Sequence, residues 1–360
     1  MSAEPLSVPA DSWQIGPHNR WAYVHLDEIV PTVPVPRRDG PVTPLGADET
    51  DLHDLLDDVP ELDGLAVVHR GRLVAEHYGG EMTETSLHLS QSVGKSVAGL
   101  VAGILVGRGE LDPSSLVTDH VPEVAGSGYE GATVRHVLDM TAAIDFVEDY
   151  AVFWTYDVAC AWHPPVAGVP GTILEYLPTI GPAGTWTHGE RFHYSTPNTD
   201  LLGIVLERVA GVPLAELISR ELWGRLGAEC DALLTVDQAG TGAIGGGFCA
   251  TLRDYARLGR LVAEGGGGIV PADWVNELGL GDPAAFARAT YATDDDGYRS
   301  QWWLRDGRPT ARGIHGQLVA ADLATQTAVV VLSSWPEALD PARDARHRSL
   351  VADVIARLAS

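Results

Sequence analysis

Lysine is almost absent from this 360-residue chain: among 24 basic residues only Lys95 is a lysine, and arginine supplies every other basic side chain. A guanidinium stays protonated in a protein, whereas a buried lysine amine can lose its proton and act as a base. The lysine occurs three residues after a serine, in Ser92-Val93-Gly94-Lys95. This arrangement is the one in which a neutral amine activates a serine nucleophile.

Cysteine is also scarce, and the three cysteines (Cys160, Cys230 and Cys249) form neither a metal-binding spacing nor a disulfide framework. The thirteen histidines include the nearby pair His188 and His193, but none forms the helical His-Glu-x-x-His signature of zinc hydrolases. We therefore expect no metal site and no cofactor.

Positive charge is sparse as a whole, since the formal net charge is −25 and no stretch is rich in lysine or arginine. Binding to a phosphate backbone requires a basic surface, so nucleic acid is not an expected partner. The most apolar run, 93–106, is interrupted by a lysine and falls short of a membrane span. Residues 1–21 lack the basic and apolar regions of a signal peptide, which indicates a cytoplasmic protein. A small-molecule substrate is the expected partner, with a homodimer as the default assembly.

The residues after Ser92 form a long apolar run that ends at Gly107, which predicts a buried helix. Positions i and i+3 share a helical face, so Ser92 Oγ and Lys95 Nζ can meet. The unpaired amides at the helix start can stabilise an oxyanion, and burial favours the neutral amine. The alternative is an ordinary helix lysine preceded by an N-capping serine.

Hydrophobic periodicity places a strand hairpin near the start of the chain and further strands near its end, around a helical middle. The expected helices are near 52–56 and at 93–106, 133–140, 174–177, 199–210, 214–226, 252–263 and 342–358, and the expected strands are 64–70, 72–78, 298–305, 313–323 and 327–333. The simplest fold is α+β, with an antiparallel sheet flanked by helices and a large all-helical insertion.

This pattern divides the chain into an irregular N-terminal arm at 1–47, a sheet domain at 48–110 plus 241–360, and a helical domain at 111–240. Ligands commonly bind between such units, so the active site is expected in the cleft between the sheet and the helices.

A second motif precedes the helix at 199–210, where Tyr194 stands in Phe-His-Tyr-Ser-Thr-Pro-Asn. A tyrosine beside a protonated Lys95 would have its phenol pKa lowered and could relay a proton between Ser92 and a leaving group. The alternative is an aromatic side chain that only packs.

Taken together, Ser92-x-x-Lys95 and Tyr194 about a hundred residues later resemble the serine β-lactamase and penicillin-binding-protein superfamily. The class C-like esterases and the 6-aminohexanoate-dimer hydrolases are the most similar branches. Segments 134–140, 245–254 and 313–317 support the resemblance, which covers residues 60–335. It implies a serine β-lactamase-like fold.

The resemblance also implies residue roles. Ser92 is the nucleophile, Lys95 the base and Tyr194 the proton relay, while the backbone amides of Ser92 and Ile314 form the oxyanion hole. Tyr150 resembles a mobile substrate-gating tyrosine, although a surface aromatic is equally compatible with its position.

Two departures from the family pattern are informative. Thr196 stands where class C β-lactamases have asparagine, and the Lys-Thr-Gly lysine of the cleft strand is absent. That lysine receives the carboxylate of a β-lactam, so its absence argues against β-lactamase or transpeptidase activity. His315 is expected to supply part of this polarity, and the oxyanion donor is placed within 312–317 to one or two positions.

Trp302 and Trp303 adjoin a strand end, so one is expected in the core and the other in the substrate cleft, where we place Trp302. The function expected is a serine hydrolase for small linear amides or esters. An acyltransferase with the same acyl-enzyme and a non-catalytic binding protein remain as alternatives.

Overall fold

A computed structural model describes residues 8–359, apart from 49, 51, 57, 58, 60 and 151–153. Its main sheet has eight strands in the order β2-β4-β3-β12-β11-β10-β9-β8, and only β2 and β4 pair in parallel. The strands are β2 (Gly46–Ala47), β3 (Leu62–His69), β4 (Arg72–Tyr78), β8 (Gly297–Arg299), β9 (Trp302–Arg305), β10 (Arg308–Gly313), β11 (Gln317–Asp322) and β12 (Thr327–Ser333). The two ends of the chain thus build one antiparallel sheet, as predicted.

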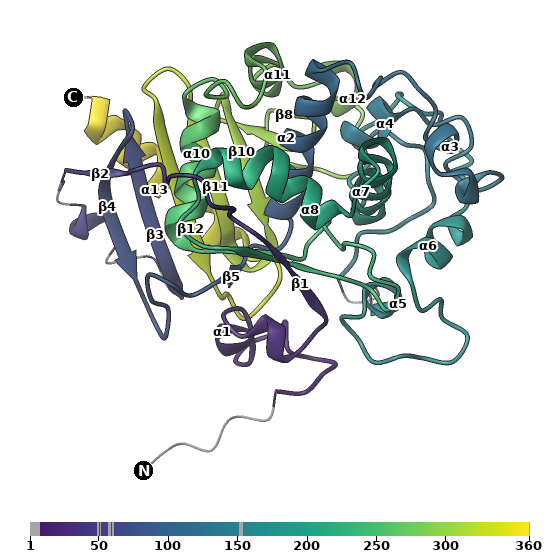
Figure 1. Cartoon of the computed structure of the whole chain (residues 1–360), viewed down its shortest axis with the longest axis horizontal. Helices are drawn as coiled ribbons and strands as arrows, with labels where there is room; N and C mark the ends of the chain where they lie inside the picture. The colour runs from purple at the N-terminus through teal and green to yellow at the C-terminus, as the bar shows by residue number, and fades with distance from the viewer. Residues whose placement is uncertain are drawn as a thin grey trace.

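The central strands are apolar on both faces because helices cover both sides of the sheet. On β12, Val329 and Val331 pack with the C-terminal helix α13 (Pro341–Ala359). The alternate residues Val330 and Leu332 belong to the core that contains α2 (Val93–Gly107) and α10 (Leu252–Ala263). This alternation is the period of two of a strand, and it creates three layers (Figure 1).

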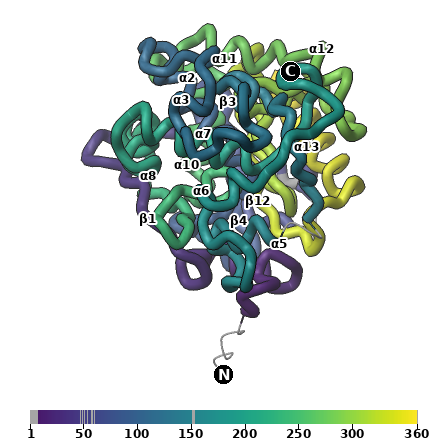
Figure 2. Tube along the Cα trace, turned by 90° about the vertical axis from the view of Figure 1, so that its right-hand side faces the viewer, coloured from purple at the N-terminus to yellow at the C-terminus, as the bar shows by residue number. Residues whose placement is uncertain are grey.

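The middle of the chain is mainly helical and gathers on one side of the molecule, which faces the viewer in Figure 2. Its helices are α3 (Val117–His120), α4 (Val134–Leu138), α5 (Trp154–Ala159), α6 (Ile173–Tyr176), α7 (Thr196–Ala210), α8 (Leu214–Ile218) and α9 (Gly224–Leu226). Helix α2 contacts both α7 and β10, so it joins this helical side to the sheet. The division into domains at 110 and 240 remains a prediction.

The remaining elements are short. They are α1 (Asn19–Ala22), α11 (Ala272–Leu278), α12 (Pro283–Phe286), the 3-10 helices η1 (Leu26–Glu28), η2 (His53–Leu55), η3 (Pro122–Val124), η4 (Leu177–Thr179) and η6 (Ile314–Gly316), and the π-helical turn η5 (Ser219–Trp223). No helix among the residues described combines the length and the apolar character needed to cross a bilayer.

A second, four-stranded sheet was not predicted. It has the order β1-β6-β7-β5 and comprises β1 (Thr32–Val35), β5 (His88–Leu89), β6 (Ala232–Thr235) and β7 (Phe248–Ala250). The prediction of an irregular arm at 1–47 was therefore wrong for β1, which contains Pro34 and pairs with a strand two hundred residues later. Four residues with a proline carry too little alternation to predict a strand.

The predicted single strand at 298–305 was also wrong, because a tight turn divides it into β8 and β9. Ser300 and Gln301 form that turn with φ values of 48° and 70°. Such angles are uncommon for residues other than glycine, so the sequence carries no turn signal here. Tertiary hydrogen bonds hold the turn, since Ser300 N donates to Asp139 and Gln301 Nε2 donates to the Leu138 carbonyl.

Candidate active site

Ser92 is the N-capping residue of α2, and the residue before it, Gln91, has a left-handed φ of 50°. Helix α2 is buried along almost its whole length, which places Lys95 inside the protein with 1% of its surface exposed. Lys95 Nζ lies 2.9 Å from Ser92 Oγ. The helical spacing of the two residues therefore brings them together as predicted.

Two further oxygens surround the Lys95 amine. Thr196 Oγ1, at the start of α7, lies 2.9 Å from Nζ, and the Gly245 carbonyl accepts a short hydrogen bond from it. Burial lowers the pKa of Lys95 to about 8, although the nearby Glu148 and Asp200 carboxylates oppose this shift. Lys95 therefore loses its proton far more readily than an ordinary lysine, as a general base requires.

Tyr194 lies beside both residues. Its phenol makes a hydrogen bond with Ser92, and Lys95 Nζ lies 5.1 Å from the centre of its ring. The expected lowering of its pKa was wrong, because burial and then the Glu148 charge raise the pKa of Tyr194 well above its usual value. A protonated Tyr194 phenol can donate a proton but does not abstract one unaided.

Two acidic residues at this site, the part-buried Glu148 and the buried Asp200, were missed in the sequence. Glu148 accepts hydrogen bonds from the backbone N and Oγ1 of Thr196, at 2.8 and 2.5 Å, and burial raises its pKa. Asp200 accepts from Tyr156 Oη at 2.6 Å and from the Gly245 amide at 2.7 Å, and burial raises its pKa to about 6. The available signals were an acid two residues before Tyr150 and an acid within α7, four residues after Thr196.

Gly245 joins the two sides of this site, because its carbonyl contacts Lys95 and its amide contacts Asp200. A Cβ atom here would lie 2.7 Å from Thr196 Cγ2 and 3.0 Å from Asp200 Oδ2. Only glycine fits between these side chains.

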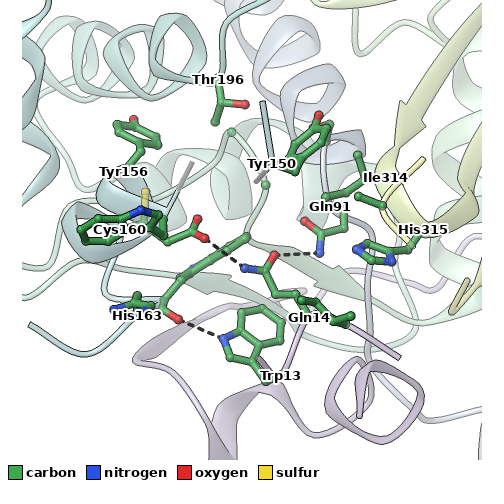
Figure 3. Close-up of a pocket in the computed structure, with 18 of the residues that line it drawn as sticks. Trp13, Gln14, Gln91, Tyr150, Tyr156, Cys160, His163, Thr196, Ile314 and His315 are labelled. Carbon is green, nitrogen blue, oxygen red and sulfur yellow. Dashed lines mark hydrogen bonds between the residues drawn. The ribbon is translucent and has the colours of Figure 1, made fainter. Parts of the chain in front are cut away.

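A cavity of about 440 Å³ opens at Ser92 (Figure 3). Residues of the N-terminal arm, 11–15, form one wall, and Tyr150, Trp154, Tyr156 and Trp162 contribute aromatic surface. In the part of the chain that the structure describes, no lysine or arginine lines this cavity, whereas five acids do: Asp11, Glu148, Asp157, Asp200 and Glu337. The cavity therefore combines aromatic surface with acidic side chains.

Asp157 is one of the acids that line this cavity. Its carboxylate accepts from Gln14 Nε2 at 3.3 Å, and Gln14 Oε1 in turn accepts from Gln91 Nε2 at 3.4 Å (Figure 3). Burial raises the pKa of Asp157 to about 7. The Gln14 amide is its only hydrogen-bond donor among the described side chains.

Ile314 and His315 line the cavity opposite, where η6 joins β10 to β11. Among the turn, loop and cap hydrogen bonds of the described residues, neither the Ser92 amide nor the Ile314 amide is a donor. His315 Nδ1 lies 2.7 Å from the Trp335 carbonyl, and burial lowers the pKa of His315 to about 4. The hydrogen bond to Trp335 holds His315 in the cavity wall, and its contribution to the polarity of the cleft remains a prediction.

The placement of Trp302 in the substrate cleft was wrong. Trp302 is fully buried and donates from Nε1 to the Ser96 carbonyl inside the core. Its neighbour Trp303 instead packs against Tyr194, with ring centres 5.2 Å apart. Successive strand residues point to opposite faces, so the choice between them required the register of β9.

The remaining predicted contacts lie at the cavity. Thr196 and Tyr150 both line it, and burial raises the pKa of Tyr150 well above its usual value. Among the described residues, no group of three or more histidine, cysteine or acidic side chains is arranged to hold a metal ion.

Comparison with known proteins agrees with this geometry. The family model described as Beta-lactamase matches residues 60–353. The chain belongs to the beta-lactamase family. A family relative, the 6-aminohexanoate-dimer hydrolase of Paenarthrobacter ureafaciens, is 40% identical over 359 residues, covering 94% of this chain and 89% of that protein. The resemblance seen in the sequence is thereby confirmed.

Solved structures show how widely the beta-lactamase fold is shared. A Bacillus anthracis protein, provisionally named a 6-aminohexanoate-dimer hydrolase, matches with a TM-score of 0.89 at 22% identity, covering 100% of this chain and 99% of that one. EstCE1, a hydrolase with promiscuous acyltransferase activity, matches with a TM-score of 0.65 at 17% identity, covering 83% and 96%. This member of the beta-lactamase family is a serine hydrolase of the amidase and esterase type.

Proposed function

We propose that the protein hydrolyses small linear amides or esters through an acyl-enzyme on Ser92. The observation that carries this proposal is the 2.9 Å approach of a buried lysine amine to Ser92 Oγ, with a protonated Tyr194 hydrogen-bonded to the same serine. A nucleophile, a base whose pKa lies near neutral pH and a proton donor are the groups that acyl transfer needs.

In the acylation step, Ser92 Oγ forms a bond to the substrate carbonyl carbon as its proton moves to Lys95 Nζ. The carbonyl electron pair moves to oxygen, and the amides of Ser92 and Ile314 stabilise the resulting oxyanion. The electron pair returns as the C–N or C–O bond breaks. Tyr194 gives its phenolic proton to the leaving amine or alcohol and recovers a proton from Lys95.

Deacylation repeats these transfers with water. Water adds to the acyl carbon as Lys95 accepts one of its protons, and the tetrahedral oxyanion occupies the same two amides. The bond to Ser92 Oγ then breaks, and Oγ recovers its proton from Lys95 directly or through Tyr194. The free acid leaves and the resting enzyme is restored.

The proposed substrate class is a linear amide or ester that carries an ammonium group. The relative at 40% identity is named for the dimer of 6-aminohexanoate, a linear amide with an ammonium group at one end and a carboxylate at the other. An acid-lined cavity without a lining cation supports the same class here, with Asp157 as the carboxylate that faces the amine. Charge-assisted hydrogen bonds of this kind are stronger than neutral ones.

Acyl transfer to an amine or alcohol is the second candidate. A cavity of about 440 Å³ has room for an acceptor beside the acyl group, and EstCE1, which shares the fold, is described as having promiscuous acyltransferase activity. The ratio of hydrolysis to transfer in the presence of added amine distinguishes the two reactions.

The test of the proposal is turnover of a panel of linear amides and p-nitrophenyl esters, matched in length, with and without a terminal ammonium. We expect wild type to hydrolyse members of the panel with a preference for the ammonium forms, and Ser92→Ala to hydrolyse none. Turnover that survives in Ser92→Ala would contradict the mechanism, and a preference for the neutral forms would contradict the substrate class.

A further inference from the structure

The neighbours of the Lys95 amine determine which of its hydrogen bonds it donates and which it accepts. A neutral amine has two N–H donors and one lone pair, and Lys95 Nζ has three oxygen neighbours: Gly245 O, Thr196 Oγ1 and Ser92 Oγ. The Gly245 carbonyl can only accept, so it takes one N–H. The direction of the other two contacts depends on where the Thr196 hydroxyl places its single proton.

Glu148 determines the direction of the Thr196 hydroxyl. A carboxylate can only accept, and Glu148 Oε1 lies 2.5 Å from Thr196 Oγ1, so the hydroxyl proton points to Glu148. The Thr196 oxygen then presents a lone pair to Lys95 and takes the second N–H. The single lone pair of the amine is left for Ser92, whose own O–H it must accept.

We propose that Glu148, acting through Thr196, orients the lone pair of the neutral Lys95 amine towards Ser92 Oγ. This inference rests on the proposed function, since it assigns a positioning residue to the same base. Without the carboxylate, the Thr196 hydroxyl is free to rotate and to donate into the Lys95 lone pair. The base would then be occupied and unable to accept the serine proton.

The geometry fixes Glu148 for this task. Its second oxygen, Oε2, accepts from the backbone N of Thr196 at 2.8 Å, so both oxygens bond to the same residue at the start of α7. The charged and titratable groups that act on the Lys95 amine are Glu148, Asp200 and Cys160. The charges of Glu148 and Arg312 also act on the neighbouring phenols of Tyr194 and Tyr150. Glu148 therefore affects both the direction of the lone pair and the proton affinity of the base.

The competing explanation is that Glu148 has only a structural role and holds its segment against α7. Kinetics separates the two explanations, because loss of a residue with a purely structural role changes stability while leaving the reaction rate of the folded protein unchanged. The variants are Glu148→Gln, whose amide can donate to the Thr196 oxygen, and Thr196→Val, which removes the hydroxyl. Thr196→Ser restores the hydroxyl, and Glu277→Gln is a matched control in an ion-pair cluster with Arg135 and Arg299.

The measurement is the rate constant of Ser92 acylation by a p-nitrophenyl ester in stopped flow, as a function of pH, with a thermal melt for each variant. Since a positioned base contributes ~10²–10⁴-fold, we expect Glu148→Gln and Thr196→Val to lose at least ~10-fold in the limiting rate at high pH. Thr196→Ser should recover most of the loss, and Glu277→Gln should lower the melting temperature without lowering this rate.

The pH dependence of the acylation rate is a second measurement that a purely structural role of Glu148 would leave unchanged. Acylation requires neutral Lys95, so the rate rises as pH passes the Lys95 pKa of about 8, and the Glu148 charge raises that pKa. Glu148→Gln should therefore shift the midpoint to lower pH while lowering the plateau. Wild-type acylation at Ser92 that both Glu148→Gln and Thr196→Val leave unchanged would overturn this inference alone. Absence of wild-type acylation would instead overturn the proposed function.

Discussion

Asn19, in the N-terminal arm, donates from Nδ2 to the Trp335 carbonyl at 2.7 Å, across 316 positions of sequence. The same carbonyl lies 2.7 Å from His315 Nδ1, next to the proposed oxyanion donor Ile314. The arm therefore does more than cover the surface, because it holds the strand connection that forms one wall of the cavity.

Asn19→Ala should destabilise the protein and slow catalysis. Removing a donor from a buried carbonyl costs about 1–3 kcal/mol, and release of the His315 segment should lower kcat more than it raises KM. Urea unfolding and steady-state kinetics measure the two effects. Asn276→Ala, at an exposed position on α11, is the control and should stay within about 0.5 kcal/mol of wild type. Unchanged stability and kcat in Asn19→Ala would contradict this role.

Lys95→Arg should abolish acylation although it retains a positive charge. A guanidinium cannot supply a neutral base, so we expect a loss of ~10²–10⁴-fold in the acylation rate constant. The burst of p-nitrophenol from an activated ester measures that constant directly. Full activity in Lys95→Arg would show that deprotonation of residue 95 is not required.

Burial of Lys95 predicts a specific dependence of stability on pH. The pKa of Lys95 falls from 10.5 to about 8 on folding, so between these values the unfolded chain binds more protons and stability rises with pH. At 1.36 kcal/mol per pH unit, this contribution is on the order of 3 kcal/mol. We therefore expect the unfolding free energy of Lys95→Met, measured relative to that of wild type, to be higher at pH 7 than at pH 10. A difference in unfolding free energy that does not change over this range would contradict the buried neutral amine.

Asp157→Asn should affect only substrates with an ammonium group. Loss of a charge-assisted contact costs about 1.5–3 kcal/mol, which corresponds to roughly 10- to 100-fold in kcat/KM. The comparison is between an amine-terminated ester and its N-acetylated form, on wild type and Asp157→Asn. Equal losses on both substrates would indicate a structural role for Asp157 instead.

The sequence predicted the residues whose relationship is local. The spacing of Ser92 and Lys95 on a buried helix follows from helical periodicity, and Tyr194 was recognised from its motif before α7. The hairpin of β3 and β4 and the helices α10 and α13 were predicted for the same reason, since each has a clear hydrophobic period.

The residues that were missed depend on packing between distant segments. Glu148 lies in a segment without periodicity, and its importance appears only when α7 brings Thr196 beside it. Trp302 and Trp303 differ only in which face of β9 they occupy, and two residues with positive φ set that register. The direction in which the pKa of Tyr194 shifts also depended on burial, which raises it and is the largest cause of the shift.

The central claim is that Ser92 is the nucleophile of an acyl-transfer reaction. Its most direct test is the intact mass of wild type and Ser92→Ala after exposure to a fluorophosphonate and, separately, to a p-nitrophenyl short-chain ester. We predict a single adduct on wild type, located by peptide mapping to Ser92, and none on Ser92→Ala. An adduct on both proteins would place the nucleophile elsewhere, and an adduct on neither would favour a non-catalytic binding protein with this fold.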